Sequence, residues 1–281
     1  MFPPLQKALE NWFDNVSDGW NPVTVRDLRR LRRSLFFTIA TIAHLGLLIF
    51  IHVADLTPLD FSEEIIMRVF PTYAAMLIVV LMVVGSEVRA RLTDELLDAV
   101  PLTQKDKVHG ILGTSCLLSA FFLVQALPFL AFPAAVPYSV LIRLGILLGM
   151  FIATQMLTLY VLPFFIRTKT VAESVIVVFV VMYLDVGALG LPFIIVWDDI
   201  LRLPLLPDAV YTSWSLIVAM SIGGILALSS FTSMNYRLSL YHFGNPFESC
   251  WQTVFVNFLC HAAWSSCWAV IAFFVAFCFS L

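Results

Sequence analysis

Long apolar runs alternate with short polar segments along most of this chain. A helix of about 20 apolar residues crosses the hydrocarbon core of a bilayer, so each run is long enough to span a membrane. The runs do not alternate between apolar and polar residues as barrel strands do, and lipid leaves open backbone groups unsatisfied, so we expect helices. The runs cover residues 35–53, 69–85, 110–132, 140–166, 171–196, 213–231 and 254–281.

Composition supports an integral membrane protein. Only 12% of the 281 residues are charged and the mean hydropathy is +0.94, which excludes an ordinary soluble domain. The last run holds Asn257 and His261. Two alternatives stay open for it: a tilted crossing or a partly interfacial segment. The sequence predicts an all-α, polytopic membrane protein with six to seven transmembrane helices.

The first 33 residues carry two amphipathic stretches. In the first stretch, apolar residues recur at helical spacing at Leu5, Leu9, Trp12, Phe13 and Val16. This pattern predicts a helix that lies in the membrane interface. A second helix is expected to begin at Asn21 and Pro22, because Asn caps helices and Pro suits the first helical position. We therefore divide the chain into interfacial helices, residues 1–33, and a transmembrane domain, residues 34–281.

Basic residues indicate the orientation. Lys and Arg near helix ends are retained in the cytoplasm, and with the N-terminus inside most of them fall in inner segments. Four arginines of the second amphipathic helix are expected to anchor it to lipid headgroups: Arg26, Arg29, Arg30 and Arg33. We expect a multi-pass protein of the bacterial cytoplasmic (inner) membrane with a cytoplasmic N-terminus. This topology accounts for the basic residues, so nothing indicates nucleic acid as a partner.

A long polar connector, residues 87–109, separates the second and third runs. Its first half predicts a short helix whose apolar side is formed by Leu92, Leu96, Leu97 and Val100. Thr93 suits the cap of this helix, and Asp94 and Glu95 occupy its first turn, where the helix dipole favours carboxylates.

Pro101 prevents smooth continuation of that helix. Thr103, with Asp106 three residues later, approximates a capping box for the next one. The prediction is two short helices bent at Pro101. A plain connector needs only a few residues, so we expect a contact that offsets the entropy of ordering this one.

Two segments resemble ABC-2-type transporter permeases. Residues 21–37, NPVTVRDLRRLRRSLFF, are similar to the N-terminal signature of that family. Residues 94–112, DELLDAVPLTQKDKVHGIL, are similar to its segment after the second span, which resembles the coupling helix that docks into a separate ATPase subunit. The resemblance implies that the ATPase-docking residues are Asp94, Glu95, Leu96, Leu97, Val100, Pro101, Leu102 and Thr103.

The resemblance implies a permease subunit of an ATP-driven transporter, working with a second permease copy and a separate ATP-binding subunit. The chain has no G-x-x-x-x-G-K-[ST] loop to hold nucleotide phosphates. We therefore expect no enzyme activity, cofactor or metal on this chain, with ATP and Mg on the partner. His109 and Gly110 stand where the family usually has Gly-Lys, and the family usually has six spans. These departures leave an alternative: a non-transporting structural subunit of a larger membrane complex.

Polar residues inside the runs are candidates for function because burying them in lipid is costly. Two interpretations of Asp185 stay open. Its helix ends early and it bonds to freed amides near the surface, or it lies on a substrate path facing Arg143. Gln155, like Gln125 and Asn257, is more typical of hydrogen bonds between helices.

Small residues and histidines in the runs each have two interpretations. The step from Gly145 to Gly149 favours close approach of another helix, within the chain or from a second copy. The histidines of the runs are more typical of packed, hydrogen-bonded side chains than of heme ligands.

Overall fold

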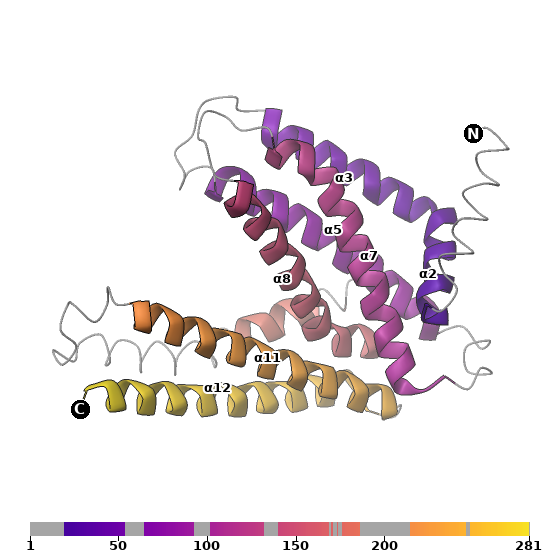
Figure 1. Ribbon diagram of the computed structural model, residues 1–281. Coiled ribbons are helices and arrows are strands. Elements are labelled where there is room, and N and C mark those ends of the chain that lie inside the picture. Colours follow the sequence, from indigo (N-terminus) through magenta and orange to yellow (C-terminus); the bar gives the residue numbers. More distant parts are fainter. Residues whose placement is uncertain are drawn as a thin grey trace. The chain divides into compact units, whose positions relative to one another are not determined.

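The computed structural model describes residues 20–53, 65–92, 102–131, 140–168, 170, 173, 176–185, 214–245 and 248–280. Within these ranges all regular structure is helical, which confirms the predicted all-α class (Figure 1). A further short helix covers Ile176–Asp185. The other elements are α2 (Pro22–Arg33), α3 (Leu35–Val53), the π-helix η1 (Ile65–Val69), α5 (Phe70–Leu92), α7 (Gln104–Ala131), α8 (Val140–Arg167), α11 (Trp214–Gly244) and α12 (Cys250–Ser280).

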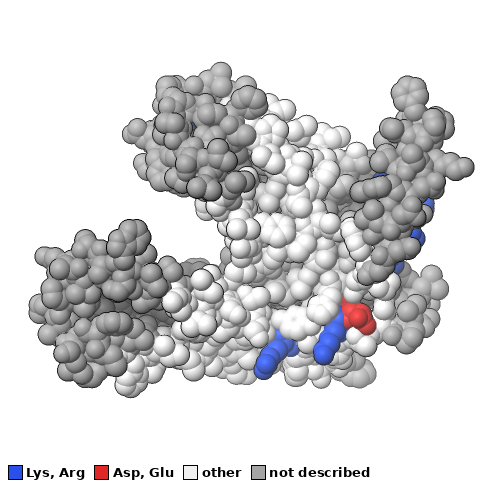
Figure 2. Space-filling model, in the orientation of Figure 1, with Lys and Arg blue, Asp and Glu red and all other residues white. Residues whose placement is uncertain are grey.

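Five of the described helices are long and apolar enough to cross a membrane, which confirms a multi-pass protein. The face seen in Figure 2 agrees, since its described surface is nearly free of charged side chains away from its lower and right-hand edges. The five candidate spans are Leu35–His52, Met67–Val88, Gln104–Phe129, Gly145–Arg167 and Cys250–Ile271.

The chain divides into two compact units, Met1–Thr158 and Leu159–Leu281, so α8 contributes to both. In the first unit α3, α5 and α7 pack against one another, and α2 packs on α7. In the second unit α11 packs against α12. Each unit contains one contact that bears on function.

Helix ends follow the predicted capping chemistry. The Asn21 side chain accepts a 2.9 Å hydrogen bond from the amide of Val23, with Pro22 in the first helical position. Thr103 and Asp106 form a capping box: the Asp106 amide donates to Thr103 Oγ1 at 3.2 Å and the Thr103 amide donates to Asp106 Oδ2 at 3.0 Å.

Several helices extend beyond the apolar runs from which they were predicted. Helix α5 continues to Leu92 and α7 begins at Gln104, so the connector between them is shorter than residues 87–109. Helix α11 continues to Gly244 although hydropathy falls after Phe231. No proline interrupts this stretch, and three of its polar residues, Asn235, Ser239 and His242, are fully buried, so the helix continues where hydropathy alone ends it.

Two predicted features lie outside the described residues. One is the interfacial helix before Trp20. The other is the short helix of the connector, with Asp94, Glu95, Leu96, Leu97, Val100 and Pro101. Of the implied docking residues, the structure describes Leu102 and Thr103, which precede α7.

Candidate functional site

The two segments that carry the family resemblance contact each other directly. Asn21 Nδ2 donates to the carbonyl of Asp106 at 2.9 Å, across 85 residues of sequence. One turn further along α2, Thr24 Oγ1 donates to the Gly110 carbonyl at 3.0 Å. These polar contacts join the start of α2 to the start of α7.

A third bond continues the contact, which we call the α2–α7 junction. Thr114 Oγ1 donates to Asp27 Oδ2 at 3.1 Å, and Asp27 is only 1% exposed. The acidic residue of the N-terminal signature is therefore a buried acceptor for the third span, not a surface charge.

Glycine permits the close approach at this junction. A Cβ placed on Gly110 would lie 2.5 Å from Val23 Cβ, and one on Gly113 would lie 2.7 Å from Thr24 Oγ1. Real Cβ atoms do not tolerate such distances, so any larger residue at Gly110 must push α2 away from α7. The close contact with Val23 therefore explains why glycine stands at position 110.

The arginines predicted to anchor α2 to lipid differ in exposure, and at least one of them also contacts another helix. Arg29, Arg30 and Arg33 are exposed, and Arg26 is half-buried. Arg30 Nε lies 3.8 Å from Glu87 Oε1 on α5, and the Glu87 side chain is 6% exposed. Arg30 therefore also ties α2 to α5.

The second unit holds a buried histidine–carboxylate pair. Asp185, in the described helix Ile176–Asp185, accepts a hydrogen bond from the Tyr160 hydroxyl of α8 at 2.5 Å. The same oxygen, Asp185 Oδ2, lies 2.8 Å from His261 Nδ1 on α12. His261 Nε2 in turn lies 3.0 Å from Asn235 Oδ1 on α11. Four helices thus meet at one pair with no more than 4% of Asp185 and none of His261 exposed.

Asp185, His261 and Asn235 form one triad of carboxylate, histidine and asparagine, and a second such triad, Glu248, His242 and Asn257, lies near the turn between α11 and α12. His242 Nδ1 lies 2.5 Å from Glu248 Oε2, and His242 Nε2 lies 2.8 Å from Asn257 Oδ1. Arg167 donates to the carbonyls of His242 and Asn245, with its guanidinium 4.0 Å from Glu248 Oε2. Arg167 therefore holds the turn against the end of α8.

In each triad, a histidine of one helix pairs with an asparagine of the other. His261 on α12 pairs with an asparagine of α11, and His242 on α11 pairs with an asparagine of α12. Both histidines belong to a row of fully buried polar side chains, which we call the polar seam. It comprises Asn235, Ser239 and His242 on α11, and Thr253, Asn257, His261 and Ser265 on α12.

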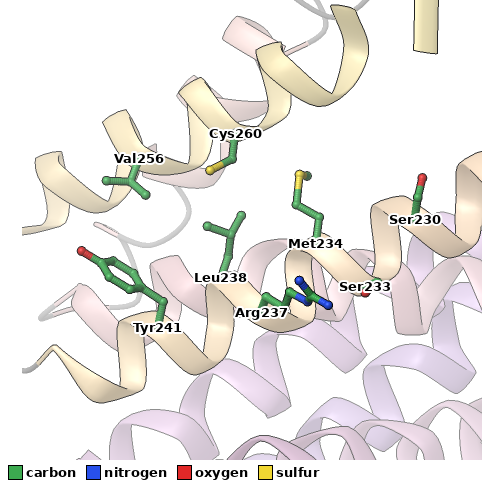
Figure 3. A pocket seen from close by; sticks show the side chains of 8 residues that line it. All are labelled: Ser230, Ser233, Met234, Arg237, Leu238, Tyr241, Val256 and Cys260. Carbon is green, nitrogen blue, oxygen red and sulfur yellow. The ribbon is translucent and has the colours of Figure 1, made fainter. Parts of the chain in front are cut away.

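An apolar groove runs beside the seam on the same two helices. It has a volume of about 610 Å³, and Figure 3 shows Met234 and Leu238 of α11 pointing toward Cys260 and Val256 of α12. Neither His261 nor Asp185 lines it. By contrast, Glu248 lines an open groove of about 620 Å³ beside the turn. The Glu248 side chain is itself only 8% exposed, against 6% for that of Asp185, so the adjoining groove, and not the exposure of the carboxylate, distinguishes the two triads.

The other predicted intramembrane residues have separate surroundings. Gln155 Nε2 donates to Ser119 Oγ at 3.0 Å and so joins α8 to α7. Gln125 Oε1 lies 3.0 Å from His44 Nδ1 and joins α7 to α3. Arg143 lies in α8, but its side chain is outside the described part, so its pairing with Asp185 stays a prediction.

Sequence reasoning missed most of the polar seam and two of the residues that bind its histidine–carboxylate groups. Tyr160, Asn235, His242 and Glu248 are absent from the candidate residues, and His261 is expected only to be packed and hydrogen-bonded, without a named partner. The usable signal was spacing: Thr253, Asn257, His261 and Ser265 recur at every fourth residue of an otherwise apolar helix. Such a polar face predicts a buried partner face of the same kind.

The sequence was compared with protein-family models, with curated proteins and with solved structures, and none of the three comparisons gives a match.

Proposed function

We propose that this chain is the transmembrane subunit of an ATP-driven transporter of the ABC-2 type. In this proposal a separate ATPase docks on the connector after α5, and its nucleotide-dependent movement changes access to a path through the membrane. The observation that carries the proposal is the α2–α7 junction, where the two resembling segments bind each other.

The junction gives the connector a mechanical role. The connector leaves α5 at Leu92 and reaches α7 at Gln104. Arg30 joins α2 to α5, and Asn21, Thr24 and Asp27 join α2 to α7. A push on the connector would therefore move α5, α7 and α2 together, which a docking partner needs if it is to drive a conformational change.

The proposed assembly contains two permease copies, a separate ATP-binding subunit and surrounding lipid, with the N-terminus in the cytoplasm. The surface of α8 supports a second copy. A Cβ added to Gly145 or Gly149 would meet no neighbouring atom of the described residues within 4 Å, so their G-x-x-x-G step is open to a helix of another chain.

The test targets the connector. The full chain is purified from its native membrane with its associated proteins, and ATP hydrolysis is measured in lipid. Changing Glu95→Lys with Leu96→Ala should remove the ATP-binding partner or uncouple its hydrolysis, because buried apolar anchors carry affinity and rim charges steer docking.

A matched control makes the same chemical changes on the expected opposite side of the membrane, at Glu64→Lys with Ile65→Ala. It should leave the association intact. If the connector variant keeps its partner and full activity, the proposal fails. If the wild-type chain purifies in stoichiometric yield with proteins that do not bind ATP, a structural subunit replaces it.

A further inference from the structure

We propose that Asp185 and His261 form a proton-binding site inside the second unit, with Glu248 and His242 as its point of exchange with water. The proposal goes beyond ATP-driven transport and does not depend on the ATPase partner. It follows from the hydrogen-bond directions, burial and access of the two triads.

The protonation of His261 is fixed on one side of its ring. Asn235 Nδ2 donates to the carbonyl of Phe231 at 3.0 Å, so Asn235 Oδ1 is the atom that faces His261. An amide oxygen only accepts, so His261 Nε2 carries a proton. The remaining ring nitrogen, Nδ1, faces a carboxylate oxygen at 2.8 Å. Any change in proton count at this histidine therefore takes place at Nδ1.

Asp185 is arranged to offset the charge of a protonated His261. Its Oδ2 accepts from the Tyr160 hydroxyl and faces His261 Nδ1. Its other oxygen, Oδ1, is buried and has no hydrogen-bond partner among the described residues. Binding takes a proton from water, forms an N–H bond at His261 Nδ1 and yields an imidazolium that donates to the carboxylate. Release returns that proton to water and leaves the neutral Nε2–H ring, whose Nδ1 lone pair then faces the carboxylate without a hydrogen bond.

The small size of the site favours a proton as its ligand. The described residues contain no group of three or more His, Cys, Asp or Glu that could hold a metal ion. The Tyr160 ring stacks on the His261 ring with centroids 5.2 Å apart, and the neighbouring groove does not reach the pair. A proton needs neither a cavity nor further ligands.

The second triad connects the site to water. Glu248 lines an open groove, and it faces His242 Nδ1 at 2.5 Å. Asn257, the partner of His242, lies one helix turn from His261 on α12 and has a buried Nδ2 with no partner among the described residues. In the proposed route protons enter at Glu248, whose side chain is 8% exposed, pass to His242 and reach the inner pair along the polar seam.

Among the described residues, the titratable and charged groups near the two histidines come from several elements. Tyr160 and Arg167 come from α8, and Asp185 comes from the helix Ile176–Asp185. The segment before α12 supplies Glu248, and α11 supplies Tyr241, whose ring lies 5.2 Å from that of His242; Asn235 and Asn257 complete the hydrogen bonds. Buried polar side chains commonly stabilise contacts between membrane helices by hydrogen bonds alone. The test therefore needs a readout that a purely structural role would not change.

The experiment follows histidine protonation by NMR in the full chain, labelled with ¹³C and ¹⁵N at histidine and held in lipid nanodiscs. Ring shifts distinguish the neutral Nε2–H form from the imidazolium. Between about pH 5 and about pH 9, His261 should interconvert between these two forms. Asp185→Asn should abolish the imidazolium form in that range, whereas Glu87→Gln, a matched change at a buried carboxyl group of the first unit, should leave His261 unchanged.

The access route is tested by exchange. Glu248→Gln should slow exchange of the His261 ring protons with deuterated water by about tenfold or more, whereas Glu173→Gln should not. A single protonation state of wild-type His261 across the whole pH range overturns the site, and that measurement needs no variant to fold. Equal titration in wild type and Asp185→Asn also overturns it. Equal exchange in the Glu248 and Glu173 variants overturns the route.

Discussion

The α2–α7 junction and the polar seam join helices by different means. At the junction, glycine brings two backbones close, and polar groups bind at the start of each helix. In the seam, full-sized polar side chains fill the contact along several turns. The junction is therefore sensitive to added volume, whereas the seam is sensitive to a lost partner.

This difference also separates the proposed roles. A junction fixed by shape transmits movement without changing its own state, which suits a coupling element. The histidines of the seam face the carboxylates Asp185 and Glu248, and proton binding to such a pair changes its hydrogen bonds, which suits a site with two states. Substitutions at four positions distinguish the two kinds of contact.

The largest effect is expected at Asp185, the carboxylate that faces His261 of the seam. Asp185→Ala leaves the Tyr160 hydroxyl and His261 Nδ1 without their acceptor in a buried position. Removing one partner of a buried pair typically costs about 3 to 5 kcal/mol of stability. Thermal unfolding of the purified protein should show this loss. Tyr183→Ala, on the same helix but 82% exposed, should change little. Equal effects of the two substitutions would show that the pair does not stabilise the second unit.

The next effect tests the junction by adding volume. Gly110→Ala places a Cβ 2.5 Å from Val23 Cβ, so the helices must separate, at an expected cost of about 1 to 3 kcal/mol. Gly149→Ala has open space and should be neutral or stabilising by up to about 1 kcal/mol, because alanine favours helix. Unfolding in denaturing detergent compares the two. A greater loss from Gly149→Ala would contradict the assigned packing.

The sequence predicted the junction better than the seam for a physical reason. Helix caps depend on local spacing, so Asn21 with Pro22 and Thr103 with Asp106 could be recognised without knowing what they contact. A buried polar face depends on its partner: Asn235 and His242 look like interruptions of an apolar run until α12 supplies His261 and Asn257.

A buried polar face can be recognised only with its partner, and this also explains why the sequence did not predict the helix lengths or the partners of Asp185. Hydropathy ends a span where polar residues begin, yet α11 continues through them because the seam satisfies their hydrogen bonds. Neither interpretation drawn from the sequence paired Asp185 with Tyr160 and His261, which are 25 and 76 residues away along the chain. Only the tertiary arrangement brings these side chains together.

A third prediction separates the two roles of Asn21. Asn21→Ser keeps an oxygen that can cap α2 but removes the Nδ2 donor to the Asp106 carbonyl. Asn21→Ala removes both. We expect losses of about 1 kcal/mol for serine and about 2 kcal/mol for alanine, measured by thermal unfolding. Identical losses would mean that the bond to α7 adds nothing beyond the cap.

The smallest effect is expected at the capping box of α7, which lies at the edge of the junction. Thr103→Ala removes the hydroxyl that accepts from the Asp106 amide at 3.2 Å, so the first turn of α7 should open more often. Hydrogen exchange of the amides in that turn should rise by about fivefold while global unfolding changes little, because the cap holds the helix end alone. Thr232→Ala is the matched control, since its hydroxyl donates to the Leu228 carbonyl within a continuous helix and caps nothing. If Thr103→Ala also accelerated exchange throughout α2, the cap and the α2–α7 junction would form one cooperative unit, and the connector would be coupled to both helices more tightly than its hydrogen bonds indicate.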